Sequence, residues 1–131
     1  MRFYTFADRY EDYDGNLSQY LNSYMEHARK KFSDSDIDKR RNLFDRTVSV
    51  IFRRITSGAA LPKLSKATIE ALFVGVGRNI DHVEEFTKAQ LVSRFKKLRA
   101  SEEFTPENLK NAITTKVKLI ARMDRAVEIF A

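Results

Sequence analysis

Few side chains in this sequence have the chemistry of a catalytic site, and most of these lie in one short segment. The chain contains two histidines, His27 and His82, and no cysteine. His82 stands between Asp81 and Glu85, so an imidazole has carboxylates beside it. Metal or hydrolytic chemistry needs several such ligands that converge on one point, and the surrounding sequence supplies no others. We therefore expect no catalytic residue and no metal ligand here, and we expect His27 to serve as a cation near a helix C-terminus.

Motifs for nucleotide or acyl chemistry are also absent from the sequence. Gly75 and Gly77 lie in an apolar segment without the following Gly-Lys-Ser/Thr of a phosphate loop. No nucleophile elbow is present, and the adjacent Glu102 and Glu103 would point to different sides of a helix. The sequence therefore predicts a chain that is not an enzyme and holds no cofactor.

Charge is distributed unevenly along the chain. Its 131 residues carry 24 Lys and Arg against 18 Asp and Glu, a formal net charge of +6. Residues 1–38 hold five basic and eight acidic side chains, so residues 39–131 hold nineteen and ten. A basic region of this kind attracts nucleic acid or another polyanion. The alternative interpretation is a set of well-solvated helix faces.

Five cations are candidate phosphate contacts because they cluster on two predicted helices. Lys118, Arg122 and Arg125 are spaced i, i+4 and i+7, which places them on one face of the last helix. Arg94 and Lys97 lie near the end of an earlier helix, where cations are favoured in any case. We interpret these side chains as contacts to DNA phosphates, with simple solvation as the alternative. No helix-turn-helix spacing, zinc finger or RNP signature predicts base readout.

Helical periodicity dominates the sequence, and no alternating strand pattern is present. The pattern predicts helices over residues 17–32, 36–56, 65–79, 87–100, 105–113 and 115–130, after a first aromatic helical segment over residues 3–13. The helix near residues 66–79 is apolar nearly all round and so belongs at the centre of a bundle. Its two glycines cost about 1 kcal/mol each in helix propensity, which close helix contact would offset. We predict one all-α domain over residues 1–131, a compact bundle of about six to seven helices.

Caps and apolar stripes set the boundaries and the inward faces of these helices. Asn16 with Gln19, and Thr87 with Gln90, form capping-box patterns, while Pro106 suits a first helical position. The stripe expected to face inward in residues 17–32 comprises Leu17, Tyr20, Leu21, Tyr24, Met25, Ala28 and Phe32. In the two other long helices the inward residues are expected to be Ile37, Phe44, Val48, Ile51, Ile55, Val117, Ile120, Val127 and Phe130.

The first segment supports an alternative function. Phe3, Phe6, Tyr10 and Tyr13 recur at three- and four-residue steps, as on one face of a helix. We interpret this face as an exposed apolar surface that pairs with a second copy or a partner chain. The chain would then be a stand-alone interaction or dimerisation module.

Several runs of sequence resemble one protein family. RFYTF at residues 2–6, YDGNL at 13–17 and YLNSYM at 20–25 are similar to the pattern RFFAF…Y…G.L..FLN.YM, which opens the helical part of the GmrSD-type restriction endonuclease N-terminal family. KLSKA at 63–67 and EALFV at 70–74 are similar to that family's SKALFEA…V helix. EF at 103–104 and KVK at 116–118 with Arg122 match its usual close. The resemblance covers nearly all 131 residues.

This resemblance implies the helical half of a nucleotide-dependent DNA restriction or phage-defence protein. In that family a sulfiredoxin/ParB-like nucleotide-binding domain precedes the helices and carries an Asp-Gly-Gln-Gln-Arg-type motif. This sequence lacks the motif, so no catalytic or cofactor-binding residue is carried over. We expect a fragment of a larger protein, since no capping residue precedes Phe3. Its expected partners are the missing nucleotide-binding domain or a second subunit, and DNA.

The sequence carries no targeting signal that we recognise. Arg2 is followed by a mixed aromatic and acidic stretch instead of the apolar region of a signal peptide. The longest apolar run, residues 71–77, is far shorter than the roughly 20 residues of a membrane span. We expect a cytoplasmic protein without membrane contact.

Overall fold

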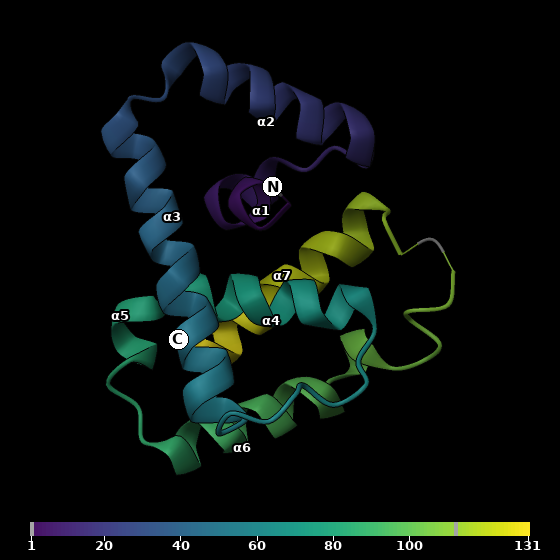
Figure 1. The fold of residues 1–131 in the computed structure, drawn as a ribbon. Helices are drawn as coiled ribbons and strands as arrows, with labels where there is room; N and C mark the ends of the chain where they lie inside the picture. Colours follow the sequence, from purple (N-terminus) through teal and green to yellow (C-terminus); the bar gives the residue numbers. More distant parts are fainter. Residues whose placement is uncertain (1, 112) are drawn as a thin grey trace.

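The computed structural model describes residues 2–111 and 113–131, and in these residues every regular element is a helix (Figure 1). The α-helices are α1 (Arg2–Arg9), α2 (Leu17–Lys31), α3 (Asp34–Ser49), α4 (Lys66–Arg78), α5 (Ile80–Val83), α6 (Lys88–Ala100) and α7 (Lys116–Phe130). Short 3₁₀ turns η1 (Tyr10–Asp12) and η3 (Glu102–Phe104) and a π-helix η2 (Val50–Ile55) complete the fold. The predicted all-α bundle is confirmed.

Helix α4 crosses the middle of the bundle and is its central element. It packs against α7, α1 and α3, which surround it in Figure 1. The hydroxyl of Ser65 accepts a hydrogen bond from the Thr68 backbone N–H at 3.1 Å and so caps the first turn. Residues around the whole circumference of α4 are buried: Thr68, Ala71, Leu72, Val74, Gly75, Val76 and Gly77. The predicted central apolar helix near residues 66–79 is confirmed.

Two glycines let α4 approach its neighbours closely. A Cβ atom at Gly75 would lie 2.7 Å from the carbonyl oxygen of Ala126, so the backbones of α4 and α7 are in contact there. A Cβ atom at Gly77 would lie 2.9 Å from Cζ of Phe3, on α1. The lower helix propensity of glycine is therefore offset by close packing, as the sequence indicated.

The caps predicted at Asn16 and Thr87 mark the starts of α2 and α6 correctly, whereas no helix begins at Pro106. The Asn16 side chain accepts from the Gln19 N–H at 3.1 Å, and Thr87 and Gln90 form a complete capping box. The serine–aspartate cluster between α2 and α3 forms another box, in which the Ser33 hydroxyl accepts from the backbone N–H of Asp36. Each cap satisfies donors that the first helical turn leaves free.

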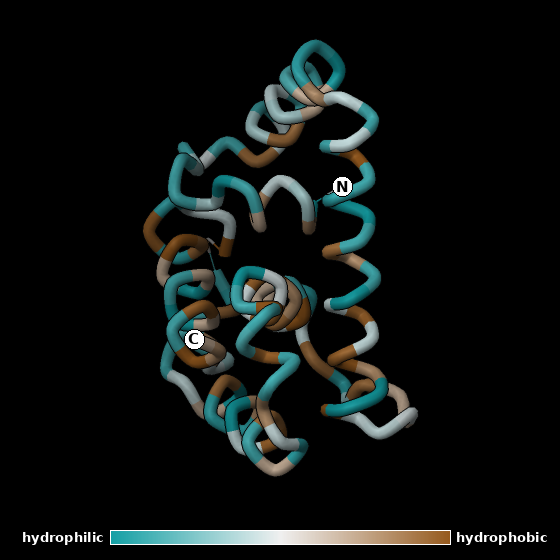
Figure 2. Tube along the Cα trace, turned by 90° about the vertical axis from the view of Figure 1, so that its left-hand side faces the viewer, coloured by the Kyte–Doolittle hydropathy of each residue, from teal (hydrophilic) through white to brown (hydrophobic). Residues whose placement is uncertain are grey.

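Helix α2 lies across α1 at one edge of the bundle, and its predicted stripe faces inward. Tyr20 and Tyr24 are buried, and the other members of the stripe are partly buried. Tyr24 donates its O–H to Asp8 of α1 at 2.5 Å, which fastens α2 to the first helix. The outer side of α2 is hydrophilic; in Figure 2 it is the mostly teal helix at the top, whereas hydrophobic residues gather lower in the molecule.

The aromatic residues of the first segment do not form an exposed partner surface. Phe6 and Tyr13 are fully buried with their ring centroids 6.0 Å apart, and Tyr10 is also buried. Phe3 is partly buried and packs on Phe44 of α3. The prediction of a partner-facing surface is therefore wrong for the three buried residues. Their helical period indicated a covered face, but the cover comes from this chain's own α2, α4 and α7.

The segment between η3 and α7 is irregular where the sequence predicted a helix over residues 105–113. Residues 105–111 and 113 form turns, and residue 112 lies outside the described residues. Leu109 makes one helix-like backbone bond to the carbonyl of Thr105. The Asn108 side chain of the segment donates to the carbonyl of Glu102 in η3 at 2.8 Å, and Lys118 of α7 donates to the carbonyl of Asn111 at 2.8 Å. These side-chain bonds replace a helical ladder.

Two residues expected to face inward are exposed. Ile37, in the first turn of α3, is 44% exposed, and Val117, in the first turn of α7, is 79% exposed. Both precede the point at which their helix meets the bundle, so the apolar stripe begins one turn before its cover does. The sequence predicts no capping residue ahead of Phe3. Because α1 begins at Arg2, the capping position is residue 1, which lies outside the described residues.

The predicted long helix over residues 36–56 begins two residues earlier, at Asp34, and changes geometry near its end. Residues Val50–Ile55 form a π-helix that buries Val50, Ile51 and Ile55. The chain then reverses at Gly58, whose φ of +83° lies in the left-handed region that glycine adopts readily.

Candidate nucleic-acid interface

Arg122, one of the five candidate phosphate contacts, is buried. Only 3% of its surface is exposed, and its Nη2 donates to the carbonyl of Ile113 at 2.6 Å. Burial lowers the pKa of its guanidinium. The i, i+4, i+7 spacing on α7 therefore does not create a cationic outer face, because this face turns toward α1 and the irregular segment. The prediction that Arg122 contacts phosphates is wrong.

Lys118 and Arg125, the other two candidates on α7, are occupied within the chain. Lys118 donates to the carbonyl of Asn111, as described above. Arg125 forms an ion pair with Glu128 at 3.3 Å and lies 3.4 Å from the hydroxyl of Ser101. Both side chains are partly buried. We therefore place no phosphate contact on α7.

Arg94 and Lys97 lie on α6 and have different surroundings. Arg94 donates to the carbonyl of Ile129 at 2.5 Å, and its guanidinium lies 4.2 Å from the centroid of the Phe86 ring. It thereby joins the end of α7 to α6. Lys97 is exposed and forms no ion pair with any described residue. Of the five candidates, Lys97 is the most available to a ligand.

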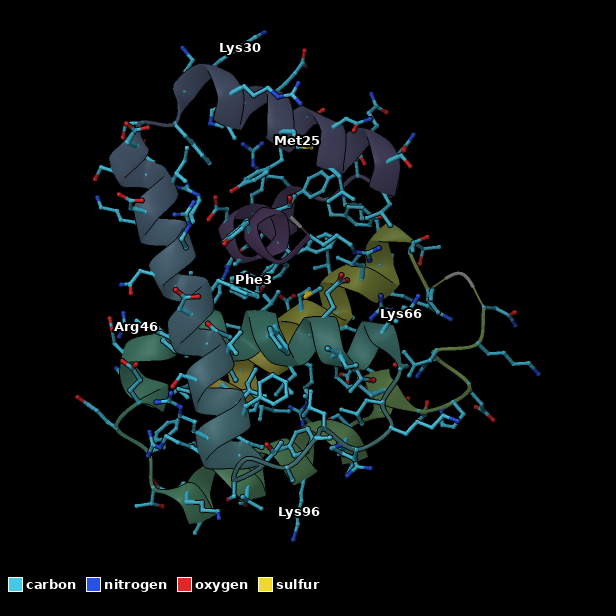
Figure 3. The ribbon with its side chains drawn as sticks, in the orientation of Figure 1. Phe3, Met25, Lys30, Arg46, Lys66 and Lys96 are labelled. Atoms are coloured by element: carbon cyan, nitrogen blue, oxygen red, sulfur yellow. The ribbon has the colours of Figure 1, made fainter. Side chains whose placement is uncertain are left out.

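Lys97 belongs to a larger cationic surface. Helix α6 contains five basic residues and no acidic residue. Its buried residues are Leu91, Phe95 and Leu98, and its exposed residues include four cations that we together call the α6 basic face: Lys88, Lys96, Lys97 and Arg99. None of these four cations forms an ion pair within residues 2–111 and 113–131. In Figure 3 the Lys96 side chain extends from α6 away from the bundle.

A shallow depression adjoins the α6 basic face. It has a volume of about 460 Å³ and lies between α6 and the end of α7. Gln90, Ser93, Arg94 and Lys97 line it together with Ala89 and Ile129. An amide, a hydroxyl and two cations are the groups that contact phosphate and sugar oxygens in protein–DNA complexes.

The acidic segment around α5 is neutralised by arginines. Arg46 of α3 forms ion pairs with Asp81, at 2.8 Å, and with Glu84. The hydrogen bond from Arg46 lowers the pKa of Glu84. Arg54 donates to the carbonyl of Glu84 at 2.7 Å and so covers the end of α5. These contacts fasten α5 to the long helix.

The two histidines lie apart from any such network. His82 is exposed, and His27 is exposed with its ring edge on Phe32, at 5.6 Å between centroids. Within the described part of the chain, no three histidine, aspartate or glutamate side chains gather closely enough to hold a metal ion. Asp81, next to His82, is bound by Arg46.

Sequence reasoning selected Arg94 and Lys97 but did not select Lys88, Lys96 and Arg99 as phosphate contacts. The signal that could have found them is the absence of any acidic residue over residues 86–101. Spacing favoured α7 instead, because three cations there recur at helical intervals. Helical spacing shows that residues share a face, whereas it does not show which face the rest of the chain covers.

Comparison of the chain with protein-family models, with curated proteins and with solved structures finds no match in any of the three. Among the helices of the described residues, none has both the length and the apolar composition that crossing a membrane requires.

Proposed function

We propose that this chain is a non-catalytic helical module that binds the phosphate backbone of DNA through the α6 basic face. The observation that carries this proposal is the set of four exposed cations on a helix without acidic residues. Lysine and arginine side chains at the surface bind DNA by displacing counterions from the phosphates. Such binding is independent of base sequence, in agreement with the absence of a base-reading motif.

The biological setting of this proposal comes from the family resemblance. The module would belong to a GmrSD-like, nucleotide-dependent DNA restriction or phage-defence protein of the cytoplasm. A nucleotide-binding domain or a second subunit would carry the reactive groups, and the helical bundle would hold the DNA beside it. The bundle suits this role because its helices are fixed by caps and close backbone contacts, so that it can present a rigid cationic surface.

DNA binding is tested by fluorescence anisotropy with a short labelled duplex at about 50 mM salt, where phosphate contacts are strong. A variant that carries Lys88→Gln, Lys96→Gln, Lys97→Gln and Arg99→Gln removes the α6 basic face. The matched control removes four exposed cations elsewhere, through Arg29→Gln, Lys30→Gln, Lys31→Gln and Lys39→Gln. Both variants have the same net charge, so that only the position of the cations differs.

We expect the α6 variant to lose at least about tenfold in affinity and the control variant to lose much less, because only close cations displace counterions. Equal losses in both variants would show that net charge alone governs binding, and the proposed interface would be wrong. The purified chain is also expected to leave DNA and nucleoside triphosphates unchanged in the presence of Mg²⁺. Turnover of either would contradict the non-catalytic assignment.

A further inference from the structure

A second cavity, which no residue of α6 lines, lies between α1 and the first half of α4. Its volume is about 430 Å³. Phe3, Ile69 and Phe73 form apolar walls, and Arg2, Lys66 and Glu70 supply the charged groups. Figure 3 labels Phe3, which points from α1 toward α4, and Lys66 at the start of α4. The cavity therefore combines an apolar wall with two cations and one carboxylate.

Glu70 is the one carboxylate among the residues that line this cavity, against the two cations Arg2 and Lys66. Arg2 binds Glu70 with two hydrogen bonds, from Nε at 2.7 Å and from Nη2 at 3.2 Å. The Glu70 side chain is only 13% exposed, whereas that of Arg2 is 49% exposed. Arg2 can therefore turn outward into solvent or onto a ligand, whereas Glu70 is mostly enclosed by the protein.

The buried Arg122 is only partly hydrogen-bonded, through Nη2 to the carbonyl of Ile113. Its Nε and Nη1 are buried and donate to no acceptor in residues 2–111 and 113–131. Glu70 acts to raise the pKa of Arg122 and Arg2 acts to lower it, so both charges are within electrostatic range of its guanidinium. A buried guanidinium with two free nitrogens is costly, since its lost hydration is not replaced. Arg2 is thus bonded to Glu70, whereas Lys66 and Arg122 form no ion pair with any described residue.

We propose that this cavity binds an amphipathic oxyanion, a ligand with an aromatic or aliphatic body and a phosphate or sulfonate group. The body packs on Phe3, Ile69 and Phe73, and the oxyanion binds Arg2 and Lys66. Glu70, released by Arg2, turns to the free nitrogens of Arg122. Every charge then has a partner, and the buried guanidinium gains the bonds that it lacks. The site is separate from the α6 basic face and does not depend on DNA binding.

Naphthyl phosphate is a suitable probe, because its ring system fits the apolar wall and its phosphate supplies the oxyanion. Binding is followed by calorimetry and by amide chemical shifts in an NMR titration. Naphthol tests the apolar body alone, and inorganic phosphate tests the oxyanion alone. We expect naphthyl phosphate to bind more tightly than either, with shifts at α1 and the first half of α4. Equal affinity for naphthol, or shifts confined to α6, would overturn the proposal.

Variants at the charged groups should change the affinity for naphthyl phosphate in opposite directions, which a merely structural role would not produce. Lys66→Gln is expected to weaken binding about fivefold, the value of one partly exposed charge contact. Glu70→Gln removes the anion that competes for Arg2 and is expected to tighten binding about threefold or more. Lys63→Gln, an exposed cation outside the cavity, is the matched control and should leave affinity unchanged. Weaker binding by Glu70→Gln in a folded protein would overturn the partner exchange.

Discussion

Replacement of Gly75 by alanine should separate the two central helices. The new Cβ would lie 2.7 Å from the carbonyl oxygen of Ala126, 2.8 Å from its carbonyl carbon and 2.9 Å from its Cβ. Nonbonded carbon atoms normally approach to about 3.5–4.0 Å, so α4 and α7 must move apart or tilt. These contacts are largely with backbone, which cannot rotate aside as the end of a side chain can.

The size of the effect follows from two opposing contributions. Alanine is favoured over glycine in a helix interior by about 1 kcal/mol. Overpacking of a core costs about 1–3 kcal/mol, and the backbone contact at Gly75 places this substitution at the upper end. The free energy of unfolding should therefore fall by about 2 kcal/mol in Gly75→Ala.

Gly77→Ala is the matched control on the same helix. Its Cβ would meet Cζ of Phe3 at 2.9 Å, the far end of a partly exposed side chain that can yield. The gain in propensity then offsets most of the contact, and we expect a change within about 1 kcal/mol. Urea unfolding followed by circular dichroism measures both variants; with a slope of about 2 kcal/mol per molar, Gly75→Ala should shift the midpoint by about 1 M. If Gly75→Ala unfolds at the same urea concentration as the wild type or higher, the close α4–α7 contact is not present.

Three further predictions concern charged and polar groups. The hydrogen bond from Arg78 lowers the pKa of Glu11, so the stabilising contribution of this carboxylate is present above the ordinary pKa of 4.5 and is lost as pH falls. Because the Glu11 side chain is half exposed, Glu11→Gln should lower the free energy of unfolding by only about 0.5–1 kcal/mol at pH 7 and should have no effect near pH 2. Urea titrations at several pH values measure this difference. Burial, and to a smaller extent the hydrogen bond to Asp124, raise the pKa of Tyr10 above its ordinary value of 10.0. The stabilisation that the Tyr10 hydroxyl provides is therefore full below pH 10.0 and is lost as pH rises. Tyr10→Phe should lower the free energy of unfolding by about 1 kcal/mol at pH 7, and a difference from the wild type that does not shrink at alkaline pH would contradict this. Arg122→Met removes a buried, incompletely paired charge and should leave the free energy of unfolding within about 1 kcal/mol of the wild type or raise it, whereas a loss above about 3 kcal/mol would show that Arg122 is a structural residue.

Local features of the sequence predict local features of this fold well. Asn16 and Thr87 mark helix starts because the side-chain oxygen of each accepts a hydrogen bond from the backbone N–H three residues later, within the first turn of the helix. The stripe of α2 and the all-round apolar character of α4 also depend on spacing within one helix. Gly75 predicted a close helix contact, although not that Ala126 would provide it.

Features that depend on contacts distant in sequence were not predictable in this way. Tyr13 looked like part of an exposed face, yet it is fully buried and donates to the carbonyl of Thr114, across most of the chain. Arg122 looked like a surface cation because its neighbours at helical spacing are cations. The segment 105–113 carried the signals of a helix start, but its Asn108 side chain donates to the carbonyl of Glu102 in η3, and Lys118 of α7 donates to the carbonyl of Asn111.

The candidate interface shows the same division. Composition identified a basic region over residues 39–131, and Lys97, selected from the sequence as a phosphate contact, is exposed. The α6 basic face emerged only when the fold showed which of these cations are already bound within the chain. Ion pairs and carbonyl contacts made by Arg46, Arg94 and Arg125 remove much of the apparent cationic surface.

The salt dependence of DNA binding tests the central claim most directly. Each neutralised phosphate contributes about −0.9 to the slope of log affinity against log salt concentration, so four contacts predict a slope of about −3.6 for the wild type. Lys97→Gln should bring this slope closer to zero by about 0.9, and Lys30→Gln on α2 should leave it unchanged. A slope near zero, or the same change for both variants, would contradict the assignment of the α6 basic face as the DNA-binding surface.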